Sequence, residues 1–169
     1  GMPIDTIKFR DSSYPIFQTD GNAARFCLPF AKEIVKGAVI FDIGYGREEW
    51  KFPGAIGIDR NSDDERLRDP MNLPFECDAI FSSHCLEHLN DWVGHLDYWT
   101  TKIKSGGTIF LYLPHWNQKY HRPFSNRKHV NAFLPEMIED YFVASDKYRN
   151  IFVSCRDAYD AFTAFAERL

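Results

Sequence analysis

The 169-residue sequence lacks any apolar run of the roughly 18 residues that a membrane-spanning helix requires. Its first residues lack the basic stretch and following apolar segment of a secretory signal peptide. Its four cysteines include no Cys-x-x-Cys pair, and the chain is larger than a typical disulfide-stabilised scaffold. We therefore expect reduced thiols, a cytoplasmic location and no membrane contact.

The sequence also has no excess of positive charge. Twenty Lys and Arg residues stand against 24 Asp and Glu residues, which gives a formal net charge of −4. A protein whose main task was to neutralise nucleic-acid phosphates would be basic, so nucleic acid is not an expected partner. The hydrophobic share of 44% is enough for a sizeable core and excludes a disordered chain. We predict one domain over residues 1–169, with an irregular arm over residues 1–20.

Four short apolar runs indicate strands that are buried on both faces of a parallel sheet; they span 38–43, 55–58, 79–81 and 108–113. Helical periodicity begins near Ala23, where Pro29 should kink the helix or delay its start. A second helix is expected over 91–104, ended by Gly106-Gly107. Strands that alternate with helices predict βαβ units and a mostly parallel sheet, hence the α/β class.

The connections on one side of this sheet are short. Only residues 44–54 join the first two strands, which leaves room for one or two helical turns. Residues 60–77 cannot hold a helix, a full strand and two loops, so this edge of the sheet should be trimmed. Near the C-terminus, a helix should open at Pro135 and be followed by a hairpin with strands near 149–155 and 161–167. A C-terminal helix from Ala158 to Leu169 is the alternative.

Two acidic residues follow or close the first two strands. Asp42 precedes the turn Gly44-Tyr45-Gly46, where glycines allow a backbone to approach a ligand closely. Asp59 ends the second strand, where an acid commonly binds ribose hydroxyls. A plain tight turn would explain the glycines equally well, but the pair of acids favours a nucleoside site.

Further segments complete a recognisable set: D-P-M-N-L-P-F at 69–75, C-D-A-I-F-S-S-H-C-L-E-H-L at 77–89, and I-K-S-G-G-T-I-F-L-Y-L-P at 103–114. In order and spacing, residues 22–143 resemble the class I S-adenosylmethionine-dependent methyltransferases, in particular their small type 11 branch. The resemblance implies a Rossmann-like sheet of seven strands in the order 3-2-1-4-5-7-6, with an antiparallel last strand. It also implies S-adenosylmethionine as the cofactor that donates the methyl group.

The resemblance implies a set of cofactor-binding residues as well. The glycine turn would face the methionine part, Asp59 the ribose and Asp69 the adenine, with Ser83 beside the sulfur. The full predicted set is Asp42, Gly44, Tyr45, Gly46, Asp59, Arg60, Asp69, Met71, Ser83 and His84. Two positions depart from the family pattern: Glu48 replaces the third glycine, and Pro70 lacks a backbone N–H where one often meets adenine.

An acceptor site is expected beside the methyl donor, because neighbouring parallel strands end at the same edge. His84 and His115 are the candidate catalytic bases, since imidazole titrates near neutral pH. The predicted substrate-binding residues lie in the following polar loop and are His121, Arg122, Asn126, Arg127 and His129. Their guanidinium groups suit an acceptor with a carboxylate or phosphate, either a small molecule or a modified polymer. Loop residues of this kind can also be merely solvated.

Single motifs of the sequence also fit three other functions. Asp59 would also suit NAD in an oxidoreductase, although the glycine turn lacks the last glycine of that motif. A methyltransferase-like binding module is the second alternative. The third arises because His84 to His88 match the inverted zinc-protease motif H-x-x-E-H, but His84 closes a strand, so no metal site is expected. Glu87 and His88 can equally serve to cap and orient the next helix.

Overall fold

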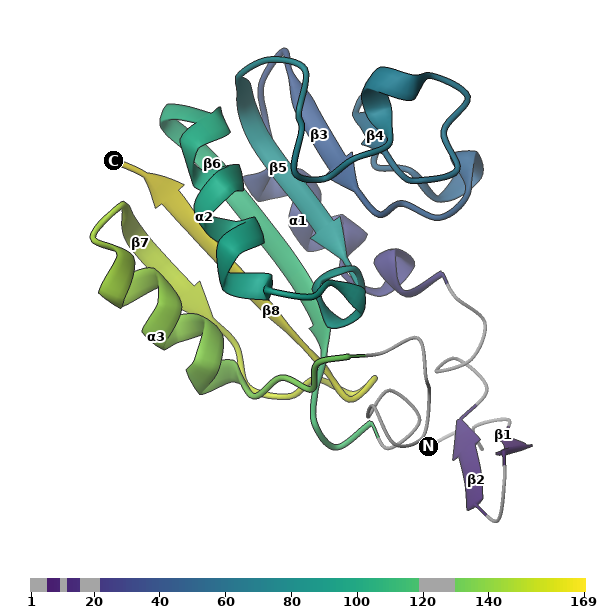
Figure 1. Ribbon diagram of the computed structural model, residues 1–169. Coiled ribbons are helices and arrows are strands. Elements are labelled where there is room, and N and C mark those ends of the chain that lie inside the picture. Colours follow the sequence, from purple (N-terminus) through teal and green to yellow (C-terminus); the bar gives the residue numbers. More distant parts are fainter. Residues whose placement is uncertain (1–5, 10–11, 16–21, 119–129) are drawn as a thin grey trace.

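The computed structural model describes residues 6–9, 12–15, 22–118 and 130–169 (Figure 1). Near the N-terminus, β1 (Thr6–Phe9) and β2 (Ser12–Pro15) pair as an antiparallel hairpin. The prediction of an irregular arm was therefore wrong for these two segments. The alternation of polar and apolar residues in Thr6–Phe9 is the strand signal that was missed.

The main sheet has six strands in the order β4-β3-β5-β6-β8-β7. β3, β4, β5 and β6 run parallel, while β8 is antiparallel to both of its neighbours. Their bounds are β3 (Ile40–Ile43), β4 (Ile56–Ile58), β5 (Cys77–Ser83), β6 (Ile103–Pro114), β7 (Tyr148–Val153) and β8 (Ala161–Arg168). The class α/β and the antiparallel hairpin are confirmed, and the alternative C-terminal helix was wrong.

The sheet order matches the predicted order except that the outermost strand is missing from the described part of the chain. Between β4 and β5, the chain forms only turns and the single 3-10 helix η4 (Glu65–Leu67). The carboxylate of Asp64 accepts a hydrogen bond from the backbone N–H of Arg66 and starts this turn. The segment is too short for a helix and a strand, so the expected trimming is confirmed and the count of seven strands was wrong.

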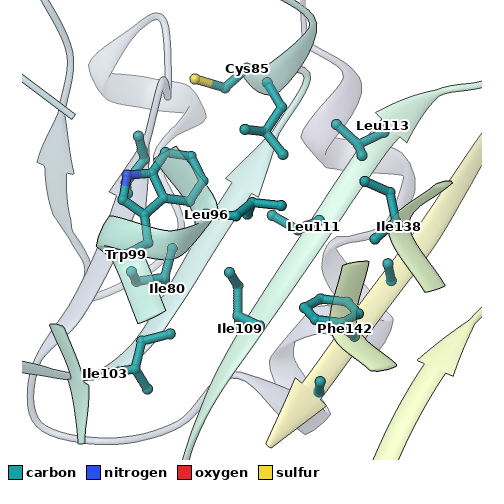
Figure 2. Close-up of a cluster of buried hydrophobic side chains, with 14 of the residues drawn as sticks. Ile80, Cys85, Leu96, Trp99, Ile103, Ile109, Leu111, Leu113, Ile138 and Phe142 are labelled. Carbon is teal, nitrogen blue, oxygen red and sulfur yellow. The ribbon is translucent and has the colours of Figure 1, made fainter. Parts of the chain in front are cut away.

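Helices cover both faces of the sheet. α2 (Trp92–Lys102) and α3 (Pro135–Ser145) lie on one face and α1 (Leu28–Ile34) on the other (Figure 1). Because side chains alternate along a strand, successive residues of β5 and β6 serve the two faces. Figure 2 shows the larger core, in which the following side chains pack together: Ile80, Leu96, Trp99, Ile109, Leu111, Ile138 and Phe142. The opposite core combines α1 with Ala79, Phe81, Phe110 and Tyr112.

Proline and glycine residues were expected to set the start of α1 and the end of α2. Pro29 lies in the first turn of α1, where its missing N–H costs nothing, and the 3-10 helix η2 (Ala23–Phe26) precedes it, so the delayed start is confirmed. In contrast, α2 ends at Lys102, and Gly106-Gly107 lie within β6. A Cβ on Gly107 would come within 2.5 Å of the carbonyl oxygen of Asp78. Gly107 therefore permits close strand contact, whereas Gly106 has a φ of +84° and a Cβ there would meet nothing within 4 Å. The prediction of this pair as a helix stop was wrong.

Among the described residues, none of the helices combines the length and apolar character needed to cross a membrane.

Candidate active site

A cavity of about 660 Å³ opens where β3, β4 and β5 end. In parallel α/β sheets, ligands bind at this carboxyl edge. The wall includes carboxylates, backbone of the glycine turn, and aromatic and imidazole rings; its members include Asp42, Gly44, Tyr45, Gly46, Trp50, Asp59, Arg60, Arg68, Pro70, Ser83, His84, Cys85 and His88.

Asp42 sits in β3 at the back of the cavity and is 1% exposed. Its Oδ2 accepts a hydrogen bond from the backbone N–H of Phe52 at 2.8 Å. Burial raises the pKa of Asp42 to about 7, and the bond from Phe52 only partly opposes this rise. The carboxyl therefore anchors the crossover after β3 and changes its charge near neutral pH.

The glycine turn is shaped by close contact with β5. Gly44 and Gly46 have φ values of +78° and +80°, a conformation that residues with a Cβ rarely adopt. The N–H of Gly44 donates to the carbonyl oxygen of Ile58 at 2.7 Å. A Cβ on Gly44 would lie 2.6 Å from the Sγ of Cys85. The turn is thus clamped between the ends of β4 and β5.

Asp59 joins this turn to the end of β4. Its Oδ2 accepts the N–H of Gly46 at 3.2 Å, and its Oδ1 accepts the N–H of Asn61 at 3.0 Å. The side chain of Asp59 is half-buried at the cavity wall. Two backbone bonds therefore fix the direction of a carboxylate that retains free lone pairs for a ligand.

The end of β5 contributes Ser83 and His84. The Oγ of Ser83 is buried, and within the described part of the chain it has no hydrogen-bond partner. His84 has a φ of +51°, and its backbone N–H donates to the carbonyl oxygen of Tyr112 at 2.8 Å. A non-glycine residue held in this region costs free energy, and such strain is concentrated at functional sites.

Comparison with solved structures finds the same architecture. An S-adenosylmethionine-dependent methyltransferase from Thermotoga maritima, a possible histamine N-methyltransferase, aligns with a TM-score of 0.66 and 14% identity, covering 84% of this chain and 87% of its own. The chain has the fold of these methyltransferases. A methyltransferase from Archaeoglobus fulgidus aligns with a TM-score of 0.61 and 16% identity, covering 89% of this chain and 94% of its own. The N-methyltransferase NodS from Bradyrhizobium japonicum, in complex with S-adenosylhomocysteine, aligns with a TM-score of 0.59 and 12% identity, covering 91% of each chain.

No protein-family model matches the sequence, and comparison with curated protein sequences finds no match either. The predicted resemblance to class I methyltransferases is thus confirmed at the level of the fold.

Within the methyltransferase fold, eight of the ten residues predicted to bind cofactor line the cavity. Asp69 and Met71 do not, although Pro70 between them does. The carboxylate of Asp69 accepts the backbone N–H of Met71 at 2.8 Å, a local turn, and both side chains are exposed.

The structure describes only some of the residues predicted to bind or act on the acceptor. His115 follows β6 at the same edge of the sheet but is not among the residues that line the cavity. Its Nδ1 accepts the backbone N–H of Asn117 at 3.0 Å. The loop residues His121, Arg122, Asn126, Arg127 and His129 lie outside the described residues.

The methyltransferase fold also brings residues to the cavity that sequence reasoning missed. Asn22, Ala23 and Ala24 also line it, although they precede β3, the first strand of the main sheet, by many positions. Only long-range packing places them there, and no local pattern signals it. The sequence marks His88 through the H-x-x-E-H spacing and as a possible helix cap, but does not assign it to this cavity. Among the residues that the structure describes, no cluster of three His, Cys, Asp or Glu side chains could hold a metal ion.

Proposed function

We propose that this protein transfers a methyl group from S-adenosylmethionine to a small or modified-polymer acceptor that carries a negative charge. The observation that supports this most is the cavity at the ends of β3, β4 and β5, with Asp42 and Asp59 on adjacent strands. Its volume lies within the roughly 300–1,000 Å³ of small-molecule sites. The fold comparisons support the same reaction class.

The residues of the cavity fit such a cofactor. Asp59 would accept hydrogen bonds from the ribose hydroxyls, since backbone N–H groups already hold its carboxylate in place. The Gly44–Gly46 turn would face the methionine part, with Asp42 and Arg60 near its charged groups. The buried Oγ of Ser83 would gain a partner. Asp69 and Met71 remain our proposal for the adenine end, because Pro70 brings their segment to the wall.

S-adenosylmethionine would supply a methyl group already activated on a sulfonium, so the chain itself need only bind, orient and exclude water. His84 stands at the cavity wall and would position the acceptor or hold its proton. His115, at the neighbouring strand end, is the second candidate. The residues proposed to hold a carboxylate or phosphate of the acceptor are His121, Arg122, Asn126, Arg127 and His129.

Calorimetric titration with S-adenosylmethionine, S-adenosylhomocysteine and NAD tests the proposal. We expect both S-adenosyl compounds to bind and NAD not to bind. Asp59→Asn should weaken binding about ten- to a hundredfold, the equivalent of roughly 1.5–3 kcal/mol for hydrogen bonds to a charged group. Asp63→Asn is the matched control, since Asp63 is exposed and does not line the cavity. Binding of NAD alone would indicate an oxidoreductase, and binding of none of the three a protein-binding module.

A further inference from the structure

Glu87 has an unusual environment for a carboxyl group. It lies in the 3-10 helix η5 (Leu86–His88), directly after β5, and is 0% exposed. Neither of its carboxyl oxygens has a hydrogen-bond partner within the described part of the chain. Burying a carboxylate without partners is costly, so such a group calls for an explanation.

The turn that carries Glu87 is fixed from the opposite side. Its backbone carbonyl oxygen accepts the N–H groups of Val130 at 2.7 Å and Asn131 at 3.0 Å. The Nδ2 of Asn131 donates to the carbonyl oxygens of Leu86 at 2.9 Å and Leu89 at 2.7 Å. These four bonds hold the backbone of η5 in place and so fix the point from which the Glu87 side chain enters the protein.

One titratable side chain stands between Glu87 and the cavity. The Nε2 of His88 lies 4.0 Å from the Oε2 of Glu87. The side chain of His88 is 38% exposed and lines the cavity, next to His84 and Ser83. The imidazole of His88 therefore lies near the buried acid and also lines the candidate acceptor space.

We propose that Glu87 and His88 form an acid–imidazole pair, in which His88 takes the proton released by the methyl acceptor and Glu87 stabilises the imidazolium that results. This inference rests on the proposed methyl transfer. His88 is the catalytic residue of the pair because it faces the acceptor, and Glu87 is a positioning residue that acts through it. His84 then positions the acceptor.

The step balances as follows. A lone pair of the acceptor atom forms a bond to the methyl carbon, and the bond from that carbon to sulfur breaks with its electron pair going to sulfur. The acceptor's proton moves to Nδ1 of His88, and the pair of electrons that held it stays on the acceptor. Before the step, the Nε2–H of neutral His88 is directed toward the carboxylate of Glu87, which fixes the tautomer that leaves Nδ1 to take the proton; after it, the same carboxylate stabilises the imidazolium.

The charge state of the pair depends on pH. Burial raises the pKa of Glu87 to about 8. Because the Nε2 of His88 lies 4.0 Å from the Oε2 of Glu87, we expect the ionisation of each group to depend on the other. The base-competent form, ionised Glu87 with neutral His88, exists above the apparent pKa values of the pair and is lost as pH falls. Cys85, whose pKa burial raises to about 12, stays neutral beside them. His84, Asp59 and Asp42 share the cavity, and burial brings the pKa of Asp42 to about 7.

Nuclear magnetic resonance of the imidazole of His88, followed against pH in the free protein, tests the pair without any acceptor. We expect two inflections in the wild-type protein and one, at lower pH, in Glu87→Gln, because the neighbouring negative charge is gone. Asp42→Asn should leave both inflections, and Glu139→Gln on the exposed face of α3 is the charge control. A single inflection near 6.5 in the wild-type protein overturns the pair, even where Glu87→Gln does not fold.

The base role is tested by the rate of S-adenosylhomocysteine formation, using the fastest acceptor from a set of small carboxylate- and phosphate-bearing compounds. His88→Asn should lower kcat about a hundredfold, as for loss of a general base, with cofactor affinity within twofold. His95→Asn is the control, since His95 does not line the cavity. A wild-type kcat in His88→Asn overturns the role of His88. Failure of the proposed function would show separately, as absence of S-adenosylmethionine binding to the wild-type protein.

Discussion

The carboxylate of Asp42 and the backbone N–H of Phe52 form a buried hydrogen bond of 2.8 Å that spans the connection between β3 and β4. This single bond holds the end of a crossover that contains only the three-residue 3-10 helix η3 (Glu48–Trp50). The same carboxyl lines the cavity, so the fold and the site depend on one group.

Asp42 should make cofactor affinity depend on pH. With a pKa of about 7, its carboxylate is largely ionised at pH 8 and largely protonated at pH 6. If only the ionised form binds the cofactor's ammonium group, the apparent Kd should rise about tenfold between pH 8 and pH 6. In Asp42→Asn, which can still accept the bond from Phe52, binding should be weaker and this dependence absent. Calorimetry at pH 6, 7 and 8 provides the measurement, and an unchanged pH dependence in the variant would contradict it.

Gly44→Ala should destabilise the fold through a clash and not only through its backbone. Gly54 is a matched control, because it has the same φ of +78° and a Cβ there would meet nothing within 4 Å. Gly54→Ala should therefore cost only the left-handed penalty of about 1–2 kcal/mol. Gly44→Ala should cost about 1–3 kcal/mol more, since its Cβ would collide with Cys85. Denaturant unfolding of both variants makes the comparison; equal losses would refute the clash.

Glu87 should make the protein less stable as pH rises. Its pKa is about 8 in the folded state and near 4.5 when unfolded, so the folded state binds more protons between these values. The free energy of unfolding should then fall from about pH 4.5 to pH 8, by a few kcal/mol in all. Glu87→Gln removes this contribution. Unfolding curves at several pH values should have a flatter pH profile for the variant, with the similar contribution of Asp42 remaining.

The backbone conformation of His84 should lower the stability of the fold, while its side chain contributes to activity. Its φ of +51° suits glycine, so His84→Gly should be more stable than His84→Ala by about 1 kcal/mol. Both variants should lower methyl transfer and leave cofactor affinity nearly unchanged. Asp146→Gly is the control at another left-handed residue, the end of α3, where stability should rise without loss of activity. Equal stability of the two His84 variants would show that no strain is stored there.

Much of the fold could be predicted because burial on both faces leaves a clear sequence pattern. The apolar runs that form β3, β4, β5 and β6 could be predicted as strands from the local sequence alone. Gly107 was misassigned because glycine both ends helices and permits close strand contact, and only the position of Asp78 distinguishes the two roles.

The cavity lining was predictable where residues lie in the last part of a strand or just after it, as with Asp42, Asp59 and Ser83. It was less predictable where the chain turns locally. The carboxylate of Asp69 bonds to a backbone N–H two residues further on, which the residue type allows but does not require. Asn22 reaches the cavity through packing of distant segments, and such packing has no local signature.

The shortness of η3 also determines how the cavity attracts a charged ligand. Three residues cannot align enough peptide dipoles to give the positive pole that the first helix of such folds offers. Positive charge at the cavity wall comes from the guanidinium groups of Arg60 and Arg68, and both residues are exposed. Exposed charges are screened by dissolved ions over about 8 Å at physiological ionic strength, whereas groups buried in the fold are screened much less. We therefore expect ligand capture at this cavity to weaken as the salt concentration of the surroundings rises.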